Sequence, residues 1–239
     1  MIWEIVRVTL PGFALGAAIM ALANRRATPA VSRGRWLKLA VFFLIVHTVL
    51  GVAAAGRPWV IGLLVGVLAA GGMELWRAWR RIEAARPARI WVGFTALAVL
   101  VLWAAWRLPT TAFAFLFVVT ATCDGFSQVI GQWLGRRPLA PWLSPGKTVG
   151  GFVGGLLAAV AVAVLVRDLL QTTPVTAAAL GMLTGVAGLA GDLAASWVKR
   201  RARLKDFSSA LPGQGGVLDR FDSLLGALAI TGSLLVVCG

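Results

Sequence analysis

Long apolar runs separated by short basic segments constrain this sequence more than any other feature. Hydrophobic residues make up 59% of the 239 residues and charged residues only 13%, whereas a soluble domain carries about 25% charged residues. Because a helix of about 20 apolar residues spans the core of a bilayer, we expect an all-α, polytopic integral membrane protein. About eight transmembrane helices are predicted, near residues 2–23, 36–55, 58–76, 89–106, 110–133, 149–169, 173–198 and 217–238.

The cations are concentrated in alternate loops between these spans. The odd-numbered loops carry most of the arginines and lysines, while the even-numbered loops hold only Arg57, Arg107 and the Arg167–Asp168 pair. Since basic loops stay in the cytoplasm, the odd loops are predicted to be cytoplasmic and both termini non-cytoplasmic. The fifth and seventh loops would then share one side of the membrane and could build one site. The same pattern explains the net charge of +14 without nucleic-acid binding, which we do not expect.

Polar residues within the spans fall almost entirely after residue 120. We therefore expect one integral membrane domain over residues 1–239. Residues 1–107 are predicted to form scaffold helices, and residues 108–239 the catalytic half.

Four aspartates lie in or beside predicted spans, where a carboxylate costs roughly 2.5–3.5 kcal/mol at the bilayer centre. Helical spacing places polar residues on common faces: Asp124 with Gln128, Asp192 with Ser196 and Lys199, and Asp219 with Asp222. One interpretation is that each aspartate pairs with a nearby cation only to hold helices together. The other is a site in which Mg²⁺, which prefers carboxylate oxygens and phosphates, bridges aspartates to a phosphate. Four carboxylates on three helices beside a basic loop favour the second interpretation.

The fifth loop contains a Gly-Lys-Thr triplet that is similar to part of a phosphate-binding P-loop. The full pattern requires a glycine five residues before Gly146, where Pro141 stands, so no P-loop is predicted. Ser144, Lys147 and Thr148 still precede a glycine-rich helix start, where backbone N–H groups and a lysine can hold phosphate. Gly154 and Gly155, further along, are predicted to allow close helix packing.

Residues 196–222 read SWVKRRARLKDFSSALPGQGGVLDRFD, which follows the pattern S-x-x-K-R-x4-K-D-x5-P-G-x-G-G-x-x-D-R-x-D. This pattern resembles the signature of phosphatidate cytidylyltransferases. The resemblance extends upstream to Gly191-Asp192, to Ser144-Pro145 with Lys147-Thr148, and to Asp124. It covers roughly residues 120–225, and the first hundred residues are similar only in being membrane helices.

The resemblance implies that CMP is transferred from CTP to phosphatidate, giving CDP-diacylglycerol and pyrophosphate, with Mg²⁺ as cofactor. Asp192 and Asp219 would then be metal-centre carboxylates, supported by Asp222. The implied catalytic residues are Asp192, Asp219, Lys199 and Arg220. The implied substrate-binding residues are Asp124, Gln128, Ser144, Lys147, Thr148, Ser196, Arg200, Lys205 and Gln214.

The resemblance also implies a homodimer in the bacterial inner membrane, among membrane lipids, with its active site facing cytosolic CTP. Three positions depart from the family pattern: Gln214 stands where a histidine is usual, Gly146 where a lysine is, and Gly150 where a glutamate is. Two alternatives to phosphatidate cytidylyl transfer stay open. One is a CTP-dependent kinase acting on a polyprenol- or phytol-type lipid, and the other is a non-catalytic, lipid-binding membrane paralogue.

Overall fold

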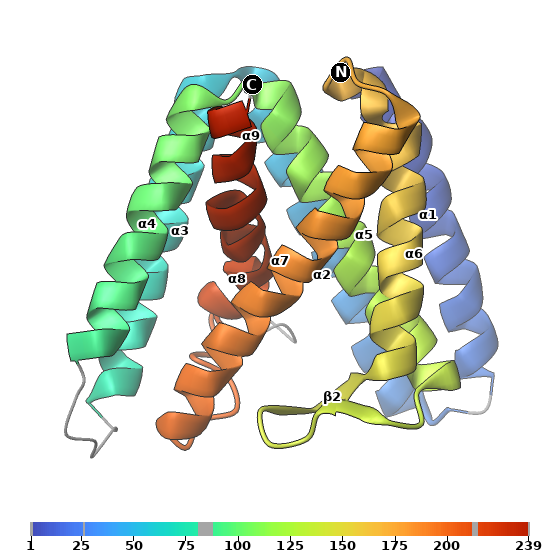
Figure 1. Cartoon of the computed structure of the whole chain (residues 1–239). Coiled ribbons are helices and arrows are strands. Elements are labelled where there is room, and N and C mark those ends of the chain that lie inside the picture. The colour runs from blue at the N-terminus through green and yellow to red at the C-terminus, as the bar shows by residue number, and fades with distance from the viewer. Residues whose placement is uncertain (1, 26, 81–87, 212–214, 239) are drawn as a thin grey trace.

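The computed structural model describes residues 2–25, 27–80, 88–211 and 215–238. These residues are mostly helical (Figure 1). The helices are α1 (Ile2–Asn24), α2 (Pro29–Ala55), α3 (Arg57–Trp79), α4 (Ala88–Arg107), α5 (Thr110–Leu134), α6 (Val149–Leu165), α7 (Pro174–Arg201), α8 (Leu218–Ala227) and α9 (Ser233–Cys238). A π-helical turn, Leu228–Gly232, joins α8 to α9, so that the last two helices form one continuous rod.

Seven helical stretches of the described chain are long and apolar enough to cross a membrane, with Leu218–Cys238 counted as one. The predicted all-α, polytopic fold is therefore confirmed. The sixth predicted span, 149–169, is shorter than expected, because α6 ends at Leu165 and Arg167–Leu169 form a 3-10 turn. Arg167 and Asp168 are both partly exposed at this helix end, and keeping this charged pair out of the hydrocarbon avoids the large cost of burying it.

A short antiparallel hairpin, which we did not expect, connects α5 to α6. Its strands are β1 (Pro138–Ala140) and β2 (Ser144–Thr148), and Pro138 pairs with Thr148. Trp142, at the turn between the strands, is 92% exposed. The predicted phosphate-binding loop is thus an ordered strand that leads directly into α6.

Small residues let the helices of the second half approach closely. A Cβ atom on Gly154 would lie 2.6 Å from a side-chain carbon of Ile130, and one on Gly155 would collide with Ser127 of α5. Both glycines therefore serve helix packing, as the sequence predicted. Gly191 of α7 and Gly226 of α8 approach each other in the same way.

Helix α7 runs obliquely across the bundle, packing against α6 near its start and against α8 near its end (Figure 1). The β-hairpin and the connection from α7 to α8 lie at the same end of the bundle (Figure 1). The start of α1 and the end of α9 both lie at the opposite end. The fifth and seventh loops can therefore contribute to a single site.

Candidate functional site

A buried ion pair joins the last turn of α7 to the first turn of α8. The Lys199 Nζ atom donates to Asp219 Oδ1 at 2.7 Å, and the two side chains are only 10% and 1% exposed. The other oxygen, Asp219 Oδ2, accepts from the backbone N–H groups of Phe207 and Gly216, each at 2.8 Å. Asp219 thus links two parts of the α7–α8 connection, at Phe207 and at Gly216, to Lys199. Since a carboxylate offers about four lone-pair directions, these three described donors leave one direction over.

A second ion pair links the hairpin to the middle of the site. Lys147 on β2 pairs with Asp192 Oδ2 on α7, and both side chains are about a quarter or less exposed. The Ser196 hydroxyl donates to Asp192 Oδ1 at 3.3 Å, one turn further along α7. The predicted polar face of the seventh span therefore carries two carboxylate–lysine pairs, at Asp192 and at Lys199.

Arg200 fastens the turn of the hairpin to the end of α7. Its Nε atom donates to the Leu143 carbonyl oxygen at 2.9 Å, and its Nη1 atom to the Leu204 carbonyl oxygen at 3.1 Å. Ser144 lies half-buried on β2. The Thr148 hydroxyl accepts from Gly151 N at 3.1 Å and caps α6. Of the predicted substrate-binding residues of the fifth loop, Lys147 is thus held against α7 and Thr148 at the start of α6.

Two further aspartates lie near Asp192. Asp124 on α5 is exposed and feels the charges of Lys147, Asp192 and Arg220. Asp222 on α8 is buried and feels the charges of Asp192, Asp124 and Lys199. Carboxylates from three helices therefore share one region with cations from β2 and α7. This is the arrangement expected for binding phosphate groups.

The remaining predicted residues lie at the edge of this region. Gln128, one turn after Asp124, is exposed, as are Lys205 and Arg220. Gln214 lies outside the residues that the structure describes.

The donor set suits a hard cation that keeps most of its waters. Among the described residues, no three His, Cys, Asp or Glu side chains lie close enough together to form a metal cage. Mg²⁺ does not need such a cage, because one or two carboxylates and the substrate phosphates commonly suffice. Asp192 and Asp222, which lie near each other, therefore fit Mg²⁺ better than a metal that requires several protein ligands.

Sequence reasoning missed one residue that contacts this region, Glu74 of α3. This carboxylate is only 4% exposed and accepts hydrogen bonds from Ser208, Val217 and Leu218. A signal was present in the sequence, since Glu74 is one of only nine acidic residues and lies near the basic end of an apolar span. Its partners, however, could not be read from the sequence.

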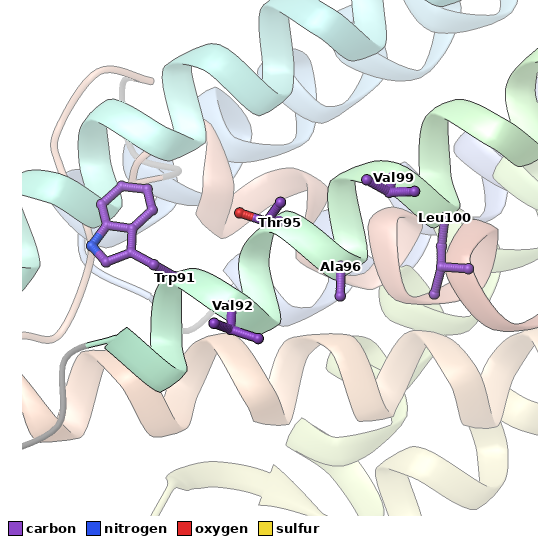
Figure 2. A pocket seen from close by; sticks show the side chains of 6 residues that line it. All are labelled: Trp91, Val92, Thr95, Ala96, Val99 and Leu100. Carbon is purple, nitrogen blue, oxygen red and sulfur yellow. The ribbon is translucent and has the colours of Figure 1, made fainter.

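An apolar groove on the described surface lies along α4 (Figure 2). It has a volume of about 650 Å³ and is lined by Trp91, Val92, Thr95, Ala96, Val99 and Leu100. In Figure 2, Val92, Ala96 and Leu100 point to one side of the helix. None of the predicted site residues lines this apolar groove, so we place the chemistry at the α7–α8 end.

The fold and the site together define a polytopic membrane protein with a cation- and carboxylate-lined site at one end of its helices. Residues 91–238 match the cytidylyltransferase family. The chain belongs to this family.

Named relatives extend this match. The phosphatidate cytidylyltransferase of Brucella abortus is 36% identical over 193 residues, covering 79% of this chain and 69% of the relative. That of Pseudomonas aeruginosa is 40% identical over 143 residues, covering 59% and 53%. That of Synechocystis sp. is 41% identical over 118 residues, covering 48% and 39%.

Proposed function

We propose that this chain is a CTP:phosphatidate cytidylyltransferase, which forms CDP-diacylglycerol and releases pyrophosphate. One observation carries the proposal. Two lysine–carboxylate pairs, Lys147–Asp192 and Lys199–Asp219, join α7 to the hairpin and to α8 at one end of a membrane protein. Membership of the cytidylyltransferase family and the names of the relatives support CTP and phosphatidate as the substrates.

The reaction joins two anions. A phosphate oxygen of phosphatidate attacks the α-phosphorus of CTP, a new P–O bond forms, and the bond to the β-phosphate oxygen breaks as pyrophosphate leaves. The attacking phosphate is already ionised, so catalysis consists mainly of positioning the reactants and neutralising their charge. In the proposal the five cations that do this are Lys147, Lys199, Arg200, Lys205 and Arg220.

Two ion pairs explain how Lys147 and Lys199 stay in place. A lysine in a partly buried site is costly unless it is paired, and Lys147 and Lys199 are paired with Asp192 and Asp219. When substrates bind, their phosphates would share Lys147 and Lys199 with the two aspartates, or replace the aspartates as partners of these lysines. The aspartates would in turn keep the lysines charged and oriented before the substrates bind.

Mg²⁺ is part of the proposal, held by Asp192 and Asp222 together with substrate phosphates, and with Asp219 contributing a carboxylate oxygen. When bound, Mg²⁺ would neutralise negative charge on the phosphates. We expect a chelator in excess of the metal to abolish CMP transfer and added Mg²⁺ to restore it, measured as labelled lipid. Full activity under chelation would remove Mg²⁺ from the proposal.

The proposed location follows from the substrate and from the loops. CTP is cytosolic, and the basic fifth and seventh loops lie at one end of the bundle. We therefore place the site on the cytoplasmic face of a bacterial inner membrane, with both termini on the other face, and expect a homodimer surrounded by membrane lipids. Accessibility of single introduced cysteines in intact cells would test the orientation, and light scattering of the detergent-solubilised protein would test the dimer.

The direct test uses purified protein in detergent with phosphatidate, Mg²⁺ and CTP labelled at the α-phosphate. We expect label in the lipid phase and an equal release of pyrophosphate. Transfer from CTP labelled at the γ-phosphate to a lipid alcohol would instead identify a lipid kinase. If neither label moved while the protein still bound anionic lipid, the chain would have kept the fold without this chemistry.

A further inference from the structure

Helix α8 begins without a cap of its own. The residue at its N-cap position is Val217, whose apolar side chain makes no capping hydrogen bond. The first N–H groups of a helix have no partner within the helix and need acceptors when they are buried. Since Leu218 and Asp219 are buried here, the acceptor has to come from elsewhere in the chain.

Glu74 of α3 supplies this acceptor. Its Oε1 atom accepts from Val217 N at 2.9 Å, and its Oε2 atom from Leu218 N at 2.8 Å. The Ser208 hydroxyl also donates to Oε1, at 2.5 Å. A carboxylate at the N-terminus of a helix is further stabilised by the helix dipole. Glu74 is thus a cap supplied by a helix more than 140 positions away in sequence.

Gly216 shows how closely the chain wraps around this carboxylate. A Cβ atom at position 216 would lie 2.6 Å from Glu74 Oε1 and 2.8 Å from Oε2. Any other residue would push the carboxylate away from Val217 and Leu218. The second glycine of the Gly-Gly pair in the sequence pattern, Gly216, is therefore explained by its close contact with Glu74 of α3.

Glu74 and Asp219 bond to neighbouring residues in the same two stretches of chain. Asp219 accepts from Phe207 and Gly216, and Glu74 accepts from the residues that follow each of them, Ser208 and Val217. Two buried carboxylates therefore hold the beginning and the end of the α7–α8 connection. Loss of either would free the loop that sets the position of the Lys199–Asp219 pair.

We propose that Glu74 is a positioning residue of the active site, which orients Asp219 and Lys199 by capping α8 and holding the α7–α8 connection. It acts through these residues, since the Glu74 carboxylate bonds to the connection, at Ser208 and Val217, and to the start of α8, at Leu218. The kinetic part of the proposal rests on the proposed cytidylyltransferase activity. The structural part, that Glu74 orders the connection, does not.

The kinetic test replaces Glu74 by Gln, which keeps the size of the side chain but turns one acceptor into a donor facing an N–H group. We expect kcat per folded molecule to fall by about tenfold to a hundredfold, with the KM for CTP changed by less than about threefold, because misplaced groups mainly affect the transition state. Ser208→Ala, which removes one of the three donors, should give a smaller fall in kcat. Folded protein is counted by size-exclusion chromatography. Asp168→Asn, at the other end of the bundle, is the matched control.

The second test needs no activity. Arg203 and Lys205 are exposed in the first part of the α7–α8 connection, and Arg136 is exposed before the hairpin. We expect trypsin to cleave after Arg203 or Lys205 about tenfold faster in Glu74→Gln, because local opening governs proteolysis. Cleavage after Arg136, which is followed by Arg137, should be unchanged.

The outcomes separate the two proposals. If the wild-type protein transfers no CMP, the proposed function fails, while the cleavage rates still decide the role of Glu74. If Glu74→Gln lowers only the melting temperature and keeps the wild-type kcat per folded molecule, Glu74 is structural and the inference fails. Unchanged cleavage at Arg203 and Lys205 would overturn it as well.

Discussion

Replacing Asp219 by Asn is expected to lower kcat for CMP transfer by at least about 100-fold. The carboxylate of Asp219 accepts from the Lys199 ammonium and from two backbone N–H groups, those of Phe207 and Gly216. An asparagine has one acceptor oxygen and an NH₂ group, so at least one donor would face another donor. It would also leave the Lys199 charge without its buried partner, which is strongly unfavourable.

The measurement is lipid labelling from α-labelled CTP, with the variant shown to be folded by its size-exclusion profile. Asp168→Asn is a suitable control, because it also neutralises a carboxylate but lies partly exposed in the 3-10 turn after α6. It should retain wild-type activity. An Asp219→Asn protein with more than a tenth of the wild-type kcat would contradict a catalytic role for this residue.

Gly191→Ala is expected to destabilise the protein by about 3 kcal/mol, near the upper end of the usual effect of overpacking. The added Cβ atom would collide with the Asp222 backbone carbonyl oxygen and would lie 2.9 Å from Gly226 Cα. These are backbone atoms of α8, which cannot rotate out of the way as a side chain can. The α7–α8 contact would have to open, and with it the site that these helices form.

The measurement is thermal unfolding in detergent followed by tryptophan fluorescence, together with the yield of monodisperse protein. Gly62→Ala is the matched control, since it is another helix-interior glycine and a Cβ atom there would meet nothing within 4 Å. This control should be neutral or slightly stabilising, because alanine favours a helix over glycine by about 1 kcal/mol. Equal melting temperatures for the two variants would show that the close approach of α7 and α8 is not needed for stability.

Several features of the site were predictable because they depend on spacing along one helix. Asp192, Ser196 and Lys199 follow one another at intervals of four and three residues, and in the structure Ser196 contacts Asp192 while Lys199 lies one turn further on. Gly154 and Gly155 could likewise be assigned to helix packing. The assignment of residues 1–107 to a scaffold stays a prediction, although Glu74, within that range, reaches the start of α8.

Other features could not be read from the sequence, because they depend on which helices become neighbours. Four aspartates and five nearby cations allow many pairings, and helix packing selected Lys147 with Asp192 and Lys199 with Asp219. The β-hairpin was also missed, since its strands are three and five residues long and contain two prolines and a glycine, which disfavour strands.

The sequence by itself determined the class of this protein and its family. Apolar length, the alternation of basic loops and the spacing of the signature are all local properties, and the bilayer makes them decisive because it allows few backbone structures. Only the tertiary structure decided how the site is held together. Backbone N–H groups such as those of Phe207, Val217 and Leu218 have no signature in a sequence, so the carboxylates that satisfy them, Asp219 and Glu74, became evident only once the helices were packed.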